Sequence, residues 1–182
     1  GADGGINSTV KATREASFMD LVSNASKRLD KMLACGTTTS EIKTGYGLDT
    51  ESELKMLRVI EELDRSHPID LVPTFLAAHA VPPEYKEDPD AYVDLICDEM
   101  LTKAMVWFRD SHFSKKGTIF FADVFCEKNA FTAEQTGRIL GAAASLGFGL
   151  KAHVDQFTNL GGSKLAIELG AISIDHLDSI SD

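Results

Sequence analysis

The stretch Leu150-Lys151-Ala152-His153-Val154-Asp155-Gln156-Phe157-Thr158-Asn159-Leu160-Gly161-Gly162 decides the fold, because its character changes in the middle. Residues 150–154 predict a short strand that offers His153 near its end. Asn159 and the two glycines predict the cap of a helix over residues 163–169. In parallel α/β folds, the loops at the carboxyl ends of the strands form the crevice or barrel mouth where ligands collect. We therefore expect His153 at a ligand-binding rim.

A second strand-like segment ends on a histidine in the same way. Residues 171–177 read Ala-Ile-Ser-Ile-Asp-His-Leu, and their histidine is His176. An isolated strand histidine is more often hydrogen-bonded within a core than functional. Two imidazoles on neighbouring strand ends change that balance, because neutral imidazole is a common ligand of zinc and iron. The pair predicts a metal ion or a polarised carbonyl at the rim.

Strand and helix alternate five times along the chain. Helix starts are predicted by T-x-x-E/Q capping boxes at Thr50/Glu53 and Thr132/Gln135 and by the Asp88-Pro89 pair. A helical repeat covers residues 17–34, and Gly36 follows it as a stop signal. The predicted strands cover residues 37–43, 69–78, 118–125, 150–154 and 171–177.

Such alternation indicates a parallel sheet, either a doubly wound sheet or a (β/α)8 TIM-type barrel. A doubly wound sheet gathers its ligands at one switch point, whereas here polar or reactive side chains follow every strand. We therefore predict an incomplete (β/α)8 barrel of about five parallel strands with flanking helices, because a complete one needs eight strands and ~250 residues. Residues 1–182 are expected to form the central part of one barrel domain that lacks the first and last strands, and the missing initiator methionine indicates a processed or excised piece. The side chains at the strand ends are those of Tyr46, His79, Cys126, His153 and His176.

Composition excludes several classes of partner. The 182 residues carry 18 basic and 28 acidic side chains, and a net charge of −10 opposes binding to nucleic acid or to anionic membranes. No apolar run reaches the ~20 residues of a membrane span. Three cysteines without CxxC spacing argue against a disulfide framework or a cysteine-ligated zinc. We expect a cytoplasmic protein that acts on a small-molecule substrate.

Three further features have a functional and a structural interpretation. Lys43 could be a Schiff-base lysine of a barrel aldolase, but pairing with Glu41 or another carboxylate is favoured. Cys126 beside Glu127 could be a nucleophile, but a small apolar residue below the rim is favoured. Gly161-Gly162 could bind phosphate, and helix–strand packing explains it equally well.

Taken together and in order, six motifs resemble the imidazolonepropionase family of the amidohydrolase superfamily. The resemblance runs nearly from end to end of the chain, and the order and spacing of the motifs separate this family from other amidohydrolases. The motifs are Gly4-Gly5-Ile6-Asn7-Ser8-Thr9-Val10 with Ala12-Thr13-Arg14, Glu41-Ile42-Lys43-Thr44-Gly45-Tyr46-Gly47-Leu48, Thr74-Phe75-Leu76-Ala77-Ala78-His79-Ala80-Val81-Pro82, Asp123-Val124-Phe125-Cys126-Glu127, Lys151-Ala152-His153-Val154-Asp155-Gln156 and Asp175-His176-Leu177.

This resemblance implies a metal-dependent (β/α)8 hydrolase of histidine degradation, which opens the ring of 4-imidazolone-5-propanoate to give N-formimidoyl-L-glutamate. It implies one divalent or ferric ion, zinc or iron, with His153 as a ligand. His176 would be the catalytic residue beside the metal, where it holds or polarises the substrate carbonyl or the bound water. Tyr46, His79 and Gln156 would match positions that contact the substrate. A homo-oligomer is expected.

The sequence also departs from the family pattern. The family's His-x-His pair, its metal-binding aspartate and its substrate-binding arginine have no counterpart in these residues, and Arg14 is not assigned that last role. The segment 108–117 is longer than the family usually has there. The amide of Gln156 cannot deprotonate water, so any general base must lie elsewhere. The isolated chain is expected to be inactive, and the alternatives are another cyclic amidohydrolase or a non-catalytic half-barrel that serves in assembly.

Overall fold

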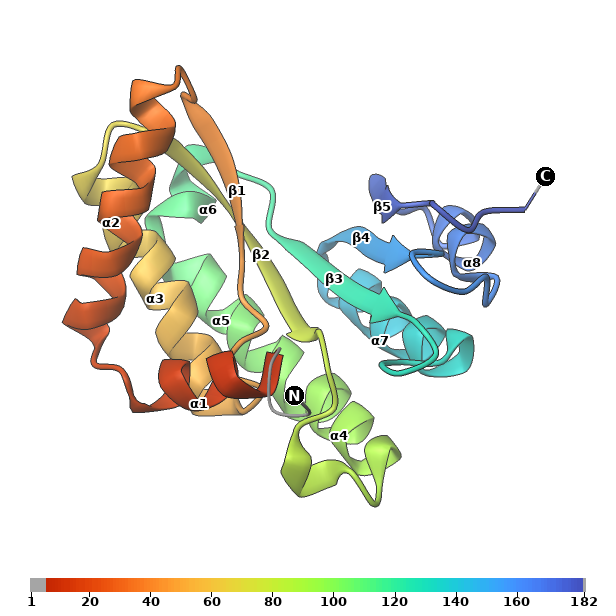
Figure 1. Cartoon of the computed structure of the whole chain (residues 1–182). Helices are drawn as coiled ribbons and strands as arrows, with labels where there is room; N and C mark the ends of the chain where they lie inside the picture. The colour runs from red at the N-terminus through yellow and green to blue at the C-terminus, as the bar shows by residue number, and fades with distance from the viewer. Residues whose placement is uncertain (1–5, 182) are drawn as a thin grey trace.

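The five strands form one parallel sheet in which each strand pairs with the next along the chain (Figure 1). This computed structural model describes residues 6–181, so Gly4 and Gly5 of the first motif lie outside the described residues. The order β1-β2-β3-β4-β5 is that of a barrel wall, whereas a doubly wound sheet reverses its order at a switch point. The curled half-barrel confirms the predicted fold. Its strands are β1 (Thr39–Lys43), β2 (Asp70–Ala78), β3 (Phe121–Cys126), β4 (Gly149–Val154) and β5 (Ser173–His176).

Helices connect the strands and pack on the outside of the curled sheet (Figure 1). A single π-helical turn, Ile96–Met100, joins α4 to α5. Along the part of the chain that the structure describes, no helix has both the length and the hydropathy of a bilayer-spanning segment. The helices are α1 (Ile6–Glu15), α2 (Phe18–Ala34), α3 (Thr50–Ser66), α4 (Pro89–Leu95), α5 (Leu101–Asp110), α6 (His112–Lys116), α7 (Ala133–Leu146) and α8 (Gly162–Glu168).

Side-chain alternation in the strands separates an apolar outer face from a polar inner face. In β4, Leu150, Ala152 and Val154 are buried, whereas Lys151 and His153 between them are partly exposed. In β3, Cys126 is only 1% exposed, and burial raises the pKa of its thiol. Cys126 is therefore a small buried residue, as the favoured interpretation of the sequence predicts, and all three cysteines are free.

Two helix starts follow the sequence prediction. The Thr132 hydroxyl accepts a hydrogen bond from the Gln135 N–H at 3.2 Å, and the Gln135 side-chain oxygen accepts one from the Thr132 N–H at 3.0 Å. Asp88 caps α4 by accepting the Ala91 N–H at 3.2 Å, with Pro89 in the first turn.

Two other helices begin within one residue of the predicted position, but their capping residues differ in part from the prediction. Asp49, not Thr50, caps α3, because its carboxylate accepts the Ser52 N–H at 2.8 Å. Glu53 consequently leaves the cap and turns toward the loop after β1. Before α8, Gly161, one of the two glycines predicted in the cap, occupies the cap position in a left-handed conformation. Asn159 instead closes a local turn on the Gly161 N–H at 3.0 Å.

Residues 108–117, where the sequence shows no clear pattern, form the end of α5 and the short helix α6. Phe113 is fully buried and fixes α6 to the core. His112 Nε2 lies 2.6 Å from Asp64 Oδ2 of α3, and its backbone N–H donates to Glu61 at 3.2 Å. Gly117, at φ 71°, ends the helix in the left-handed region that favours glycine. The segment therefore packs against α3 on the side of the amino end of β2, where Lys116 pairs with Asp70, and away from the carboxyl ends of the strands.

Candidate metal centre and substrate rim

The carboxyl ends of the five strands carry a continuous row of rings. Tyr46 meets His79 edge-on, with ring centroids 5.0 Å apart. Phe125 stands between the next two histidines, 6.3 Å from His79 and 6.3 Å from His153. The row ends with His176, whose ring lies 5.4 Å from that of His153. Four residues singled out from the sequence thus share one rim, and Phe125 links them although the sequence does not predict it as a site residue.

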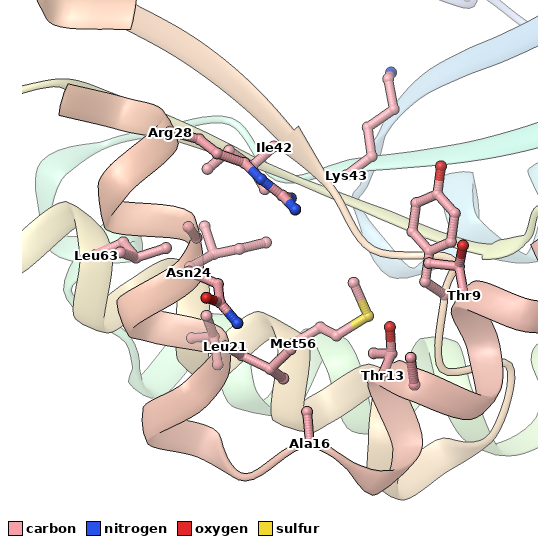
Figure 2. Close-up of a pocket in the computed structure, with 15 residues that line it drawn as sticks. Thr9, Thr13, Ala16, Leu21, Asn24, Arg28, Ile42, Lys43, Met56 and Leu63 are labelled. Carbon is pink, nitrogen blue, oxygen red and sulfur yellow. The ribbon is translucent and has the colours of Figure 1, made fainter. Parts of the chain in front are cut away.

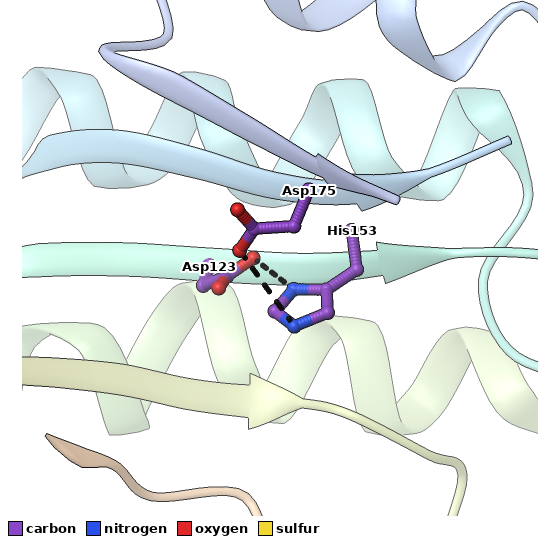
Figure 3. A group of neighbouring side chains, drawn as sticks. All are labelled: Asp123, His153 and Asp175. Carbon is purple, nitrogen blue, oxygen red and sulfur yellow. Dashed lines mark hydrogen bonds and ion pairs between the residues drawn. The ribbon is translucent and has the colours of Figure 1, made fainter. Parts of the chain in front are cut away.

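His153 is held between two aspartates (Figure 3). Its Nδ1 lies 3.0 Å from Asp123 Oδ1, and its Nε2 lies 3.9 Å from Asp175 Oδ2. Because an ionised carboxylate can only accept, we assign the Nδ1 proton to the bond with Asp123. Nε2 then carries the lone pair on the side of Asp175. A histidine that donates one ring N–H to a carboxylate and keeps the other nitrogen free is the usual form of a metal ligand.

Lys43 neutralises part of this acidic cluster. Its Nζ lies 2.7 Å from Glu41, 2.8 Å from Asp123 and 3.6 Å from Asp175. Burial alone would lower the pKa of Lys43, but the Asp123 and Glu41 carboxylates outweigh it and raise the pKa above 10.5. A Schiff-base lysine needs the opposite shift, because the neutral amine is the nucleophile. The structure therefore supports the ion-paired interpretation of Lys43.

Glu41 completes the charged inner face. It pairs with Lys151 at 3.0 Å as well as with Lys43. Burial would raise the pKa of Glu41, but bonds from Lys43, Thr74 and Lys151 lower it to about 2. Three carboxylates (Glu41, Asp123, Asp175) thus face two ammonium groups, which leaves one negative charge when the histidines are neutral. This excess suits a bound cation.

The residues fit a metal ion. One atom from each of Asp123, His153 and Asp175 lies within 4.8 Å of the others. Two ligands of one tetrahedral zinc lie ~3.4 Å apart, close to the 3.9 Å between His153 Nε2 and Asp175 Oδ2. Asp123 is already committed to His153 and Lys43, so it supports the ligand rather than completing the ligand set. Sequence reasoning missed both Asp123 and Asp175, although Asp123 is the one charged residue in an otherwise apolar strand.

His79 is fixed in one tautomer by the loop after β1. Its Nδ1 lies 3.0 Å from the carbonyl oxygen of Gly45, and a carbonyl can only accept, so Nδ1 carries the proton. Burial lowers the pKa of His79, which favours the neutral ring. His79 therefore keeps Nε2 as an acceptor, and this suits a substrate that offers an N–H.

The other two predicted residues are His176, the last residue of β5, and Gln156, in the loop after β4. His176 is exposed and has φ 79°, followed by Leu177 at φ 70°, so the chain turns sharply as β5 ends. Gln156 lies in the loop after β4, outside the row of rings, and its backbone carbonyl accepts the Ser179 hydroxyl at 3.5 Å.

A groove of about 550 Å³ lies between α1, α2, α3 and β1 (Figure 2). Its lining is mainly apolar and includes Leu21, Met56 and Leu63. Of its described lining residues, Lys43 and Tyr46 also belong to the rim and its charged inner face. We place the chemistry at the rim, because the titratable groups and the candidate metal ligands lie there.

Comparison with known proteins gives relatives of this chain. No protein-family model matches the chain. A protein of Herpetosiphon aurantiacus named imidazolonepropionase is 54% identical over 176 residues, which cover 97% of this chain and 41% of the relative. The chain is homologous to imidazolonepropionases. This confirms the resemblance that the motifs predicted.

Other imidazolonepropionases match at similar identity. The protein of Chloroflexus aggregans is 52% identical over 177 residues, which cover 97% of this chain and 42% of the relative. The protein of Shewanella loihica is 50% identical over 181 residues, which cover 100% of this chain and 42% of the relative. The chain therefore spans about two-fifths of the length of the imidazolonepropionases that it matches.

Proposed function

We propose that this protein hydrolyses 4-imidazolone-5-propanoate to N-formimidoyl-L-glutamate, a step of histidine degradation. Water adds to the ring carbonyl carbon, the C–N amide bond breaks, and the released nitrogen takes up a proton. The observation that carries this proposal is the Asp123-supported His153, which stands on the same rim as Tyr46 and His79. The identity to imidazolonepropionases supports the choice of substrate.

We further propose zinc or iron as the metal, held through His153 Nε2 and the Asp175 carboxylate. When bound, such an ion polarises a carbonyl oxygen and lowers the pKa of bound water toward ~7. The family's His-x-His pair and its aspartate would supply the remaining ligands. A catalytic zinc takes at least three protein ligands, so the two in this chain are fewer than a full set.

The chain's own residues would bind and orient the ring. His79 Nε2 would accept a substrate N–H, and the Tyr46 hydroxyl would donate to a substrate oxygen or nitrogen. His176, beside His153, would hold the scissile carbonyl or the attacking water as the catalytic residue. Gln156 would contact the substrate through its amide, which cannot act as a base.

A hybrid enzyme tests the function. Residues 1–182 replace the matching segment of the Herpetosiphon aurantiacus relative, and ring opening is followed by absorbance with zinc or iron present. Turnover of imidazolonepropanoate is the expected result. A folded, metal-loaded hybrid that opens another cyclic amide but not this ring would point to the alternative amidohydrolase. The isolated 182 residues, assayed beside it, should show no turnover.

Metal content separates the enzyme from a non-catalytic half-barrel. A hybrid that binds no stoichiometric zinc or iron would favour the half-barrel that serves only in assembly. We also propose that the protein works as a homo-oligomer in the cytoplasm. The three free cysteines and the net charge of −10 support a reducing compartment without nucleic-acid or membrane partners.

A further inference from the structure

The buried carboxylate of Glu53 accepts several backbone hydrogen bonds from the loop that carries Tyr46. Glu53 Oε1 accepts the N–H groups of Gly47 at 2.7 Å and Leu48 at 2.9 Å. The Gly45 N–H donates to both Glu53 oxygens, at 2.9 and 3.1 Å. Three backbone donors therefore converge on one side chain, which is 0% exposed.

This arrangement makes the loop and the glutamate depend on each other. A buried carboxylate is stable only when its oxygens are hydrogen-bonded, and the loop N–H groups provide those bonds. Gly45, at φ 95°, and Leu48, at φ 55°, lie in the left-handed region, which Leu48 as a non-glycine residue rarely adopts. Leu48 is also fully buried. The loop conformation is thus held by Glu53 and by packing, not by local preference.

Arg14 bonds the carbonyl groups of the same loop. Its Nε donates to the Gly47 carbonyl at 2.6 Å, and its Nη2 donates to the Leu48 carbonyl at 3.3 Å. The guanidinium is itself fixed by Asp49 at 3.0 Å and by Glu84 at 2.7 Å. Glu53 therefore accepts hydrogen bonds from the backbone N–H groups of the loop, and Arg14 donates hydrogen bonds to its backbone carbonyls.

The loop in turn fixes His79. A Cβ at Gly45 would lie 2.6 Å from the Leu76 carbonyl oxygen and 3.0 Å from His79 Cβ, so the loop backbone touches the end of β2 directly. At this point the Gly45 carbonyl oxygen accepts a hydrogen bond from the His79 Nδ1–H, with 3.0 Å between the two heavy atoms. Gly45 therefore links Glu53 to His79, because its N–H donates to Glu53 and its carbonyl determines which nitrogen of His79 faces the rim.

We infer that Glu53 is a positioning residue of the substrate site, acting on Tyr46 and His79 through the loop of residues 44–48. Its carboxylate keeps the Gly45 carbonyl on His79 Nδ1 and leaves Nε2 to accept an N–H from a cyclic amide. It also keeps Tyr46 edge-on to His79. The substrate half of this role rests on the proposed function, whereas the structural half does not.

The test is amide exchange and histidine nitrogen NMR on the whole chain with Glu53→Gln. A glutamine can keep its oxygen on Gly47 and Leu48, but its NH2 group then faces the Gly45 N–H. We expect exchange protection at Gly45 to fall at least ~10-fold relative to the β3 amides, as one lost hydrogen bond implies. We also expect His79 to lose its single tautomer.

Asp64→Asn is the matched control. Asp64 lies on the same helix, its side chain is 2% exposed, and it accepts a hydrogen bond from the Leu71 N–H at 2.7 Å. Among the described residues, its bonding partners all lie outside the loop 44–48. It should leave the Gly45 protection and the His79 tautomer unchanged. Unchanged values in Glu53→Gln, or equal losses in both variants, would overturn the inference.

If the Glu53→Gln variant does not fold, the Arg14→Gln variant tests whether the loop conformation fixes the tautomer of His79. The Arg14 side chain is 29% exposed, and it bonds the loop carbonyls and the partly exposed carboxylates of Asp49 and Glu84, so the core should survive its loss. Faster exchange at Gly47 and Leu48 together with a mixed His79 tautomer would support the inference. A rigid loop and an unchanged tautomer would overturn it.

In the hybrid enzyme, Glu53→Gln should raise KM at least ~10-fold with wild-type metal content, because a misplaced acceptor weakens binding without touching the ligands. Asp64→Asn should keep the parent KM. An inactive parent hybrid would count against the proposed function alone, since the NMR experiment still decides whether Glu53 positions the loop. An active hybrid whose Glu53→Gln variant keeps its KM would count against the positioning role.

Discussion

Asp123 Oδ1 lies 3.0 Å from His153 Nδ1, and the Asp123 carboxylate is completely buried. The two residues stand on neighbouring parallel strands, where Phe125 pairs with His153 and Asp123 pairs with Lys151. Asp123 therefore contacts His153 on the inner face of the sheet and fixes the orientation of its ring through Nδ1. The free Nε2 is left on the side of Asp175, where a metal can bind.

Replacing His153 should remove the metal and the activity together. In the hybrid enzyme, His153→Ala deletes the proposed metal ligand, so we expect both stoichiometric metal and most turnover to be lost. His67→Ala, at the end of α3, is the control and should keep both. Metal analysis and ring-opening kinetics measure the two effects. Normal metal content with normal turnover in His153→Ala would show that His153 is not a ligand.

His176→Ala should separate the two effects. If His176 acts beside the metal, as its position next to His153 suggests, turnover should fall much more than metal content. Parallel loss of metal and turnover would instead make His176 a ligand. The comparison uses the same two assays under identical metal loading.

Asp123→Asn should weaken metal binding while the ligands stay in place. The amide is nearly isosteric but has no charge to favour the Nδ1–H tautomer of His153, and loss of such outer partners typically costs 10–100-fold in metal affinity. Competition with a chelator measures the affinity, and Asp64→Asn again serves as the matched aspartate control. An Asp123→Asn enzyme with parental metal affinity would contradict the supporting role.

Tyr46→Phe should cost one hydrogen bond to the substrate. The ring keeps its edge contact with His79, so only the hydroxyl is lost. We expect kcat/KM to fall by an amount equivalent to ~0.5–1.5 kcal/mol, or more if its partner is charged. Steady-state kinetics on the hybrid measures it. Unchanged kinetics here and in His79→Ala would place the substrate elsewhere.

Glu127 should make part of the stability depend on pH. Burial would raise its pKa, but the Thr158 hydroxyl and the N–H groups of Lys128, Phe157 and Thr158 lower it to about 2. Its folded pKa lies below the usual 4.5, so its contribution is complete above pH 4.5 and is lost as pH falls toward 2. The loop that it holds is the one that carries Gln156.

Urea unfolding of the chain at several pH values tests this. The difference in unfolding free energy between wild type and Glu127→Gln should be ~1–3 kcal/mol at pH 7 and should shrink below pH 4.5. The exposed Glu134→Gln is the control and should show no such difference. A difference that is constant down to pH 2 would mean that Glu127 does not titrate with unfolding.

Much of the fold could be predicted from the sequence, because the signals are local. The capping box of Thr132 and Gln135 and the cap at Asp88 involve neighbours three residues apart. The alternation around Ala152 and His153 likewise follows from strand geometry alone. Together with the family motifs, these local patterns suffice to predict that four of the ring residues share one rim.

Tertiary structure alone decided what the buried carboxylates do. Thr50 and Glu53 have the spacing of a capping box, yet Asp49 takes the cap and Glu53 binds the loop of Tyr46, a choice that depends on how that loop packs. Asp123 meets His153 from 30 positions away and Lys43 from 80 positions away. No local pattern encodes such pairs, because the bonds form only when the strands align, and a buried charge is stable only where its partners converge.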